Sequence, residues 1–83
     1  MKELWYFYAD WCSFCQQQNP ILDKFIENNP KLSVIKILES ENADALAQNN
    51  ITGFPTFVVF NGNGEPRRVD GLHSEEQLTG LFA

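Results

Sequence analysis

The two cysteines of this 83-residue chain, Cys12 and Cys15, are separated by only two residues. A disulfide between them would close a four-residue loop, which the loop-entropy model values at only about 2 kcal/mol. Such a pair also cannot cross-link distant segments, as the disulfides of small secreted domains do. Residues three apart share one face of a helix, within reach of disulfide geometry. The spacing therefore favours thiol–disulfide exchange over a structural role.

The segments around the pair predict different roles for the two sulfurs. An apolar run from Leu4 to Tyr8 precedes Cys12, and apolar residues at helical spacing follow Cys15. Cys12 is therefore expected at a strand-to-helix turn, where free N–H groups and the helix dipole favour the thiolate over the thiol. This predicts Cys12 as the nucleophile that attacks a disulfide, and Cys15 as the resolving thiol that releases the product.

Two cysteines at this spacing have two other interpretations. They could form half of a zinc site, or they could be a coincidental pair of buried small residues. Zinc needs two further ligands, but the chain has no other cysteine and its single histidine is His73. We therefore expect no metal and no bound cofactor. His73 is assigned no role.

The composition restricts the class of protein. A content of 43% hydrophobic residues in 83 residues supports one compact domain, expected to span residues 1–83, and excludes a disordered chain. The formal net charge of -5, with no basic stripe, disfavours a nucleic-acid partner. No run approaches the roughly 18 apolar residues of a membrane span, and the first residues lack a signal-peptide pattern. We therefore expect a cytoplasmic protein without a membrane partner.

Hydrophobic patterning predicts the element order β-α-β-α-β-β-α. The predicted strands are Leu4 to Tyr8, Leu32 to Leu38, Thr56 to Phe60 and Arg67 to Val69; the predicted helices run from Cys12 to about Asn28, from Asn42 to Gln48, and onward from a Ser74 cap. The first three strands are almost continuously apolar, which predicts that helices cover both of their faces. The strand-helix-strand opening implies a parallel pair, and Asn61-Gly62-Asn63-Gly64 predicts a closing hairpin with an antiparallel pair.

A set of motifs resembles the thioredoxin family. It consists of Trp11-Cys12-Ser13-Phe14-Cys15, Pro20, Gly53-Phe54-Pro55-Thr56, Asn63-Gly64-Glu65 and Gly71. Their order and spacing match the family from Leu4 to the C-terminus. The resemblance implies an α/β thioredoxin fold with a four-stranded mixed sheet flanked by three helices. It also implies that the first strand and helix of a full-length thioredoxin are missing.

We predict that four residues bind the substrate around the sulfurs: Trp11, Phe14, Phe54 and Pro55. The resemblance implies that Trp11 packs beside the site, whereas the contact of Phe14 with the substrate is our own hypothesis, since burial is hard to arrange at the tip of the helix turn. Pro55 would be a cis-proline facing the disulfide, and the Phe54 backbone would pair with an extended substrate. From the residues alone, a trans proline opening an edge strand is the simpler interpretation. Partial burial in the core is the simpler interpretation for Trp11 and Phe54. An apolar patch at this place suits docking to protein disulfides.

Three departures from the family pattern concern redox tuning and docking. Ser13-Phe14 stands where typical thioredoxins have Gly-Pro, so the redox potential does not follow from the sequence. Tyr6 occupies the position of a buried aspartate, and a tyrosine is a poor proton acceptor near neutral pH. Lys36 matches a family lysine and could tune the same region, although a surface lysine is an equal alternative. Phe54 is bulkier than the usual residue before the proline. We predict that Tyr6 and Lys36 tune the pKa of the site.

The leading hypothesis is a monomeric thiol–disulfide oxidoreductase that reduces protein disulfides in the cytoplasm, where thiols are kept reduced. Thioredoxin reductase or glutathione would recycle its Cys12–Cys15 disulfide. The alternatives are a glutaredoxin-like, glutathione-dependent reductase, and a thioredoxin-fold subunit or binding module without a redox role. A further alternative is a secreted oxidase or a domain of a membrane-tethered reductase, because the stretch from Tyr8 to Cys12 resembles the approach to the motif in such domains.

Overall fold

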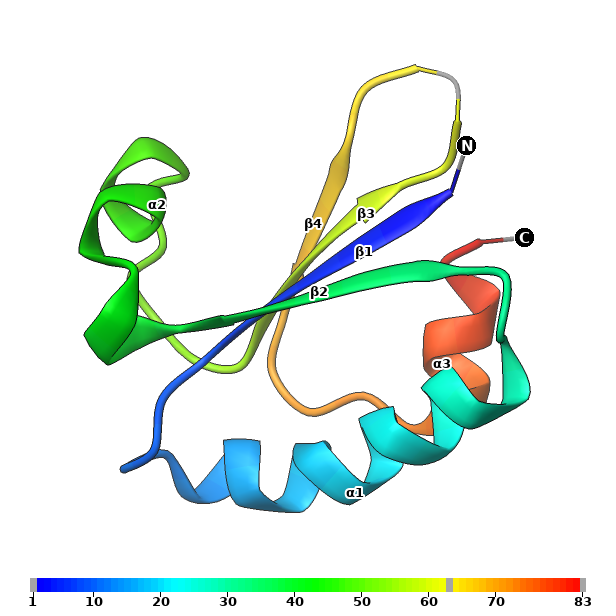
Figure 1. Ribbon diagram of the computed structural model, residues 1–83, viewed down its shortest axis with the longest axis horizontal. Coiled ribbons are helices and arrows are strands. Elements are labelled where there is room, and N and C mark those ends of the chain that lie inside the picture. Colours follow the sequence, from blue (N-terminus) through cyan, green and yellow to red (C-terminus); the bar gives the residue numbers. More distant parts are fainter. Residues whose placement is uncertain (1, 63, 83) are drawn as a thin grey trace.

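The computed structural model describes residues 2–62 and 64–82. Four strands form one mixed sheet in the order β2-β1-β3-β4 (Figure 1). The strands are β1 (Glu3–Tyr8), β2 (Ser33–Leu38), β3 (Thr56–Phe60) and β4 (Arg67–Asp70). β1 runs parallel to β2 and antiparallel to β3, and β3 runs antiparallel to β4. The mixed four-stranded sheet, its parallel β1–β2 pair and its antiparallel β3–β4 pair are as predicted, and the antiparallel β1–β3 pairing that joins them comes from the structure.

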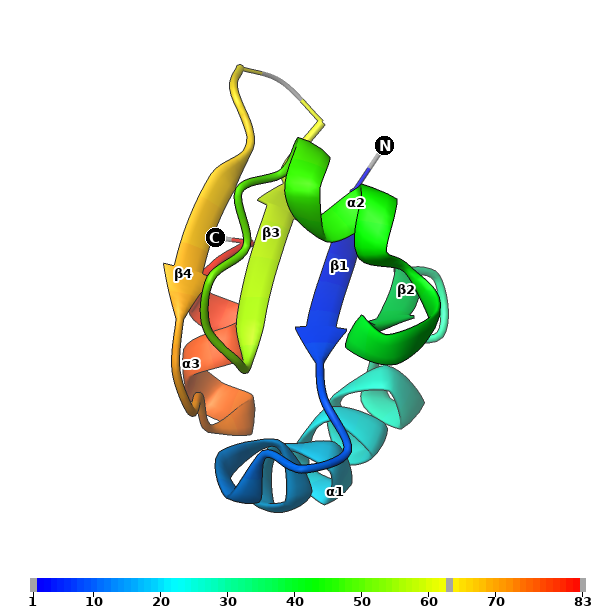
Figure 2. The ribbon, with the colours of Figure 1, turned by 90° about the vertical axis from the view of Figure 1, so that its left-hand side faces the viewer.

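Three helices cover the sheet: α1 (Ser13–Asn28), α2 (Ala43–Gln48) and α3 (Glu75–Gly80), with a 3₁₀ turn, η1, at Glu39–Glu41. Figure 2 looks onto the face that α2 covers, with α3 behind the sheet. Because strand side chains alternate, each face has its own core. The core under α1 and α3 contains Leu4, Tyr6, Leu22, Phe25, Phe57, Val59, Leu78 and Leu81. The core under α2 contains Phe7, Ile37, Ile51 and Val58.

The start of the third helix follows from its sequence. The Ser74 hydroxyl accepts a hydrogen bond from the Gln77 N–H at 3.1 Å, and the Gln77 side chain accepts one from the Ser74 N–H at 2.9 Å. This reciprocal pair satisfies two donors that a helix start would leave free. The predicted cap at Ser74 is confirmed, and it begins α3 immediately after the loop that follows β4.

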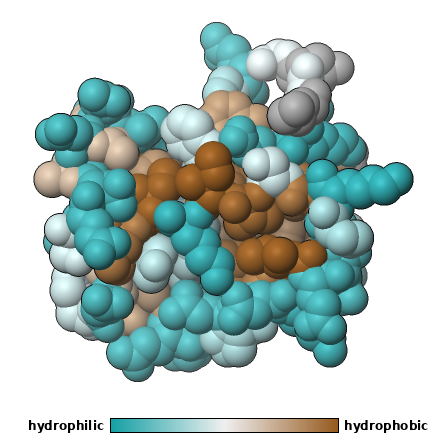
Figure 3. All heavy atoms as spheres, viewed as in Figure 1, coloured by the Kyte–Doolittle hydropathy of each residue, from teal (hydrophilic) through white to brown (hydrophobic). Residues whose placement is uncertain are grey.

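The prediction that helices cover both faces of all three apolar strands is wrong for β2. This strand lies at the sheet edge, pairs only with β1, and exposes Ile35. Figure 3 shows apolar surface along β2 on the side seen in Figure 1. The six-residue α2 packs against Phe7 and Val58 of the inner strands, so the outer part of β2 stays uncovered. An apolar run alone does not distinguish an edge strand from an inner one.

The antiparallel pairing of β3 with β4 confirms the predicted hairpin. Gly62 and Gly64 have φ values of 92° and 76°, a region that glycine adopts without a steric penalty. Asn63, which belongs to the predicted turn, lies outside the described residues. Among the residues that are described, no helix has the length and apolar content to cross a bilayer.

We expect Leu22→Ala to destabilise the domain by about 2–5 kcal/mol, because it leaves a cavity where α1 packs on the sheet. Leu22 is fully buried. Urea denaturation of the reduced protein measures the free energy of unfolding. Lys24→Ala is the matched control, since Lys24 is exposed on the same helix, and it should change stability by less than about 0.5 kcal/mol. Similar losses in the two variants would contradict this account of α1.

Candidate active site

Cys12 lies where β1 turns into α1 and caps the helix with its own sulfur. The Cys15 N–H donates a hydrogen bond to Cys12 Sγ at 3.1 Å. The Cys12 thiol in turn donates to the Phe54 carbonyl oxygen at 3.5 Å. A sulfur at a helix N-cap sits at the positive end of the helix dipole, and a backbone N–H pointing at it stabilises a negative charge. The sulfur therefore lies between a donor that favours the thiolate and an acceptor that holds the thiol.

Cys15 lies one turn further along α1, behind Cys12. Its side chain is 1% exposed, against 6% for Cys12, and both cysteines are free thiols. Burial, followed by the hydrogen bond with Cys12, raises the pKa of the Cys15 thiol from 9.0 to about 11. Cys15 is therefore a protonated thiol at neutral pH. The deeper burial and raised pKa of Cys15 are what is expected of an inner resolving sulfur, and the helix-cap position of Cys12 is what is expected of an outer attacking one.

Tyr6 lies beneath Cys15, on β1. Its hydroxyl donates to Asn19 Oδ1 at 2.7 Å and is 3.5 Å from the Cys15 carbonyl oxygen. Burial, together with the charge that Cys15 would carry, raises the pKa of the Tyr6 hydroxyl far above its usual range. Tyr6 is thus a hydrogen-bond donor beside Cys15 and does not supply a base. Asn19, its partner, was not singled out from the sequence, although its position four residues after Cys15 puts it on the same helix face.

The peptide bond between Phe54 and Pro55 is cis. This confirms the geometry that the family resemblance implies and corrects the trans proline that the residues alone favour. Pro55 is fully buried next to the start of β3, while Trp11 is 69% exposed. The Trp11 ring meets the Phe54 ring edge-on, with centroids 5.7 Å apart. Trp11 therefore lies on the surface beside the cis peptide and not in the core.

Two more exposed apolar side chains belong to segments next to Trp11 and the cis-proline. Phe14, between the cysteines, is 57% exposed, and Leu72, in the loop after β4, is 40% exposed. Gly71, with φ of 91°, donates its N–H to the Pro55 carbonyl oxygen at 2.8 Å, which brings Leu72 next to the cis-proline. Sequence reasoning missed Leu72. Its signal was an apolar residue between the motif glycine and the Ser74 cap.

Lys36 lies opposite Tyr6 in the pairing of β1 with β2. Its ammonium group, however, forms an ion pair with Asp23 of α1 at 2.9 Å, and both side chains are exposed. The predicted tuning role of Lys36 therefore has no supporting contact with either sulfur among the described residues. Its observed contact fits the alternative of a surface lysine.

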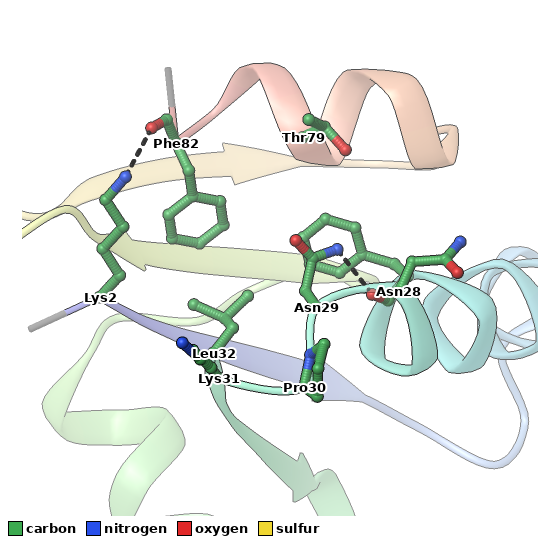
Figure 4. A pocket seen from close by; sticks show the side chains of 9 residues that line it. Lys2, Asn28, Asn29, Pro30, Lys31, Leu32, Thr79 and Phe82 are labelled. Atoms are coloured by element: carbon green, nitrogen blue, oxygen red, sulfur yellow. Dashed lines mark hydrogen bonds between the residues drawn. The ribbon is translucent and has the colours of Figure 1, made fainter.

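A cavity of about 660 Å³ lies where the C-terminal end of α1 meets the start of β2 and the end of α3 (Figure 4). Phe25, Leu32 and Phe82 supply apolar lining, and Lys2 Nζ donates to the Phe82 carbonyl oxygen at 3.1 Å. None of the predicted site residues lines it, since the cysteines belong to the other end of α1. Within residues 2–62 and 64–82, no group of three or more His, Cys, Asp or Glu side chains is placed to hold a metal ion.

A free dithiol at a strand-to-helix turn, with the carbonyl of Phe54 next to its first sulfur, is the arrangement of a dithiol oxidoreductase site. The family model described as Thioredoxin matches residues 2–82. The thioredoxin of Chlamydia pneumoniae is 33% identical over 76 residues, covering 92% of this chain and 74% of the relative. The thioredoxin of Alicyclobacillus acidocaldarius is 32% identical over 78 residues, covering 93% and 74%. The structure of mitochondrial thioredoxin 3 from Saccharomyces cerevisiae superposes with a TM-score of 0.84 at 28% identity, covering 98% of this chain and 76% of that one.

The chain therefore belongs to the thioredoxin family, and its fold is the thioredoxin fold. Its Cys12–Cys15 pair makes it a thiol–disulfide oxidoreductase.

The raised pKa of Cys15 predicts how a Cys12→Ser variant reacts with iodoacetamide. Only the thiolate reacts, and burial, the largest cause of the raised pKa of Cys15, remains in this variant. The rate should rise with pH and level off only above the ordinary thiol pKa of 9.0. In guanidinium chloride, where burial is lost, the same variant should level off at a lower pH, near the ordinary thiol value. A folded protein whose rate levels off below pH 9 would show that burial does not hold the proton.

Proposed function

We propose that this chain reduces protein disulfides, with Cys12 as the nucleophile and Cys15 as the resolving thiol. The observation that carries the proposal is the hydrogen bond from the Cys15 N–H to Cys12 Sγ at the start of α1. It marks Cys12 as the sulfur whose negative charge the backbone stabilises. Cys15 lies three residues further along the helix, at a spacing that allows a disulfide with Cys12, and it is the more deeply buried of the two.

The exchange takes place in two steps. The Cys12 thiolate attacks one sulfur of a substrate disulfide, which forms a mixed disulfide and expels the other substrate sulfur as a thiolate. Cys15 then loses its proton and attacks Cys12 Sγ, which breaks the mixed disulfide and expels the second substrate thiolate. Two electrons pass to the substrate, and a Cys12–Cys15 disulfide remains. A reductant, thioredoxin reductase or glutathione, must supply two electrons to restore the dithiol.

The proton of Cys15 sets the condition for the second step. Since the pKa of Cys15 is about 11, the thiol needs an acceptor near neutral pH. Tyr6 does not fill this role because its own hydroxyl is harder still to ionise. We assign the acceptor role to the substrate thiolate released in the first step, which is a base of ordinary thiol strength at the same place. The Tyr6 hydroxyl supports the Cys15 thiolate as a donor.

The exposed side chains of Trp11 and Phe14, together with the half-buried Phe54, form the proposed docking surface for the protein around the disulfide. Pro55 is fully buried, so its side chain adjoins this surface without being part of it. Exposed apolar side chains that surround a reactive group favour contact with a protein surface. Residues 1–83 would act as one monomeric domain. A reducing compartment such as the cytoplasm suits this activity, because there the recycled dithiol is the stable form.

Reduction of insulin tests the proposal. We expect Cys12→Ser to abolish the activity, because no attacking thiolate is left at the surface. Cys15→Ser should instead accumulate a mixed disulfide with insulin that non-reducing electrophoresis detects, because release needs the second sulfur. Gln17→Ala is the control, since Gln17 is exposed on the same helix and lies outside the pair. Full activity of the Cys12→Ser variant would overturn the assignment and favour a binding module.

The same assay separates the two recycling routes. Turnover with NADPH and thioredoxin reductase is expected for a thioredoxin-type reductase. Turnover with glutathione and glutathione reductase alone would instead support the glutaredoxin-like alternative.

We expect Phe14→Ala to lower kcat/KM for insulin by about fivefold, as the loss of about 1 kcal/mol of apolar contact with the substrate predicts. Phe14 is exposed, so stability should not change. The Cys12–Cys15 redox potential, measured by glutathione titration, is the second readout, because the residues between the cysteines also influence redox balance. The docking role is wrong if both insulin reduction and the potential are unchanged.

A further inference from the structure

Gln18 is a fully buried polar residue on α1, one turn after Cys15. Both ends of its side-chain amide bond to the backbone of a single residue. Gln18 Nε2 donates to the His73 carbonyl oxygen at 2.9 Å, and the His73 N–H donates to Gln18 Oε1 at 2.8 Å. The amide thereby pairs with His73 much as a neighbouring strand would, and it ties α1 to the loop between β4 and α3.

This loop is held on its other side by the cis-proline segment. The Gly71 N–H donates to the Pro55 carbonyl oxygen at 2.8 Å, and the φ of 91° at Gly71 suits glycine. His73 Nδ1 lies 2.8 Å from the Gly71 carbonyl oxygen, and the His73 ring packs edge-on against Phe57. Leu72 stands between these two anchored residues, with its side chain 40% exposed.

We propose that Gln18 is a positioning residue whose amide holds the 71–73 loop so that Leu72 forms one wall of the docking surface for protein disulfides. The inference rests on the proposed function, since it concerns how substrates dock. Gln18 touches neither sulfur through its amide, and it acts on the substrate through Leu72. It therefore sets how well a polypeptide is bound rather than how fast the sulfurs exchange.

The physical reason is the cost of a lost partner. If an apolar side chain replaces Gln18, the His73 N–H and carbonyl oxygen lose their partners at a part-buried place, where water replaces them only if the backbone moves. The backbone at His73 must then shift toward water to recover hydrogen bonds. Leu72 is adjacent to His73, so it moves with the loop, whereas Cys12 and Phe54 are held by contacts of their own.

Gln18→Met, which keeps the shape of the side chain and removes the amide, tests this directly. The expected result is a rise in KM for an extended peptide disulfide by about fivefold, with kcat unchanged. The rate with 5,5′-dithiobis(2-nitrobenzoate), a small disulfide that does not need the loop, and the Cys12–Cys15 redox potential should stay at wild-type values. Gln17→Met, at an exposed position on the same helix, is the matched control and should match the wild type throughout.

Gln18→Glu adds a readout that a purely structural role would not move. A protonated carboxyl can donate to the His73 carbonyl oxygen and accept from its N–H, whereas a carboxylate can only accept. Burial raises the pKa of such a carboxyl, so the KM ratio of variant to wild type should be near one at pH 5.5 and rise toward the Gln18→Met ratio by pH 8. Cys15, Tyr6 and His73 are the other titratable groups near this side chain, and the wild type measured at each pH accounts for them. If Gln18→Met does not fold, the rise of this ratio between pH 5.5 and pH 8 carries the test, and a ratio that stays near one at both pH values would overturn the proposal.

A double-mutant cycle with Leu72→Ala connects the residue to its effect. If Gln18 acts through Leu72, the double variant Gln18→Met with Leu72→Ala should have the KM of Leu72→Ala alone. Additive effects, an unchanged KM in Gln18→Met, or an equal loss with the small disulfide would each overturn the proposal. Failure of the proposed function would look different, because the wild type itself would then not reduce the peptide disulfide.

Discussion

The hydrogen bond between the Cys15 N–H and Cys12 Sγ is the interaction on which the site depends. It makes the reactive sulfur the cap of the helix that carries the second sulfur, so one backbone group both begins α1 and stabilises a thiolate. The bond requires α1 to start directly after β1, and α1 keeps that position because Leu22 and Phe25 bury its inner face against the sheet. The helix cap and the packing of the core therefore both hold Cys12 and Cys15 in place.

Burial divides the work between two chemically identical groups. Cys12, 6% exposed, contacts a backbone donor and the Phe54 carbonyl oxygen, whereas Cys15, 1% exposed, holds its proton to about pH 11. The side chains that hydrogen-bond beneath Cys15 in the described part of the chain are Tyr6 and Asn19, and neither is a base. The two environments therefore suit the proposed division into an attacking and a resolving sulfur.

The proposed docking surface is built from three separate parts of the chain. Trp11 and Phe14 come from the start of α1, Phe54 from the loop before β3, and Leu72 from the loop after β4. The hydrogen bond from the Gly71 N–H to the Pro55 carbonyl oxygen joins the last two parts, and Gln18 joins the third to α1. Under the proposal, a surface assembled in this way depends on the polar contacts beneath it, which gives a reason for the burial of the Gln18 amide.

Local patterns determined most of the fold: the apolar runs, the Ser74 capping box and the glycine turn predicted all four strands and three helices within a few residues. The motif spacing identified Cys12 and Cys15 for the same reason, because they lie within one short segment whose geometry is local. The cis form of Pro55 followed only from the family resemblance, since the residues alone favoured a trans proline. Only the tertiary structure decided that β2 is an exposed edge, that Lys36 pairs with Asp23, that Asn19 accepts from Tyr6, and that Gln18 pairs with His73. These outcomes depend on contacts between residues far apart in the chain, and the type of a residue does not specify which distant partner reaches it.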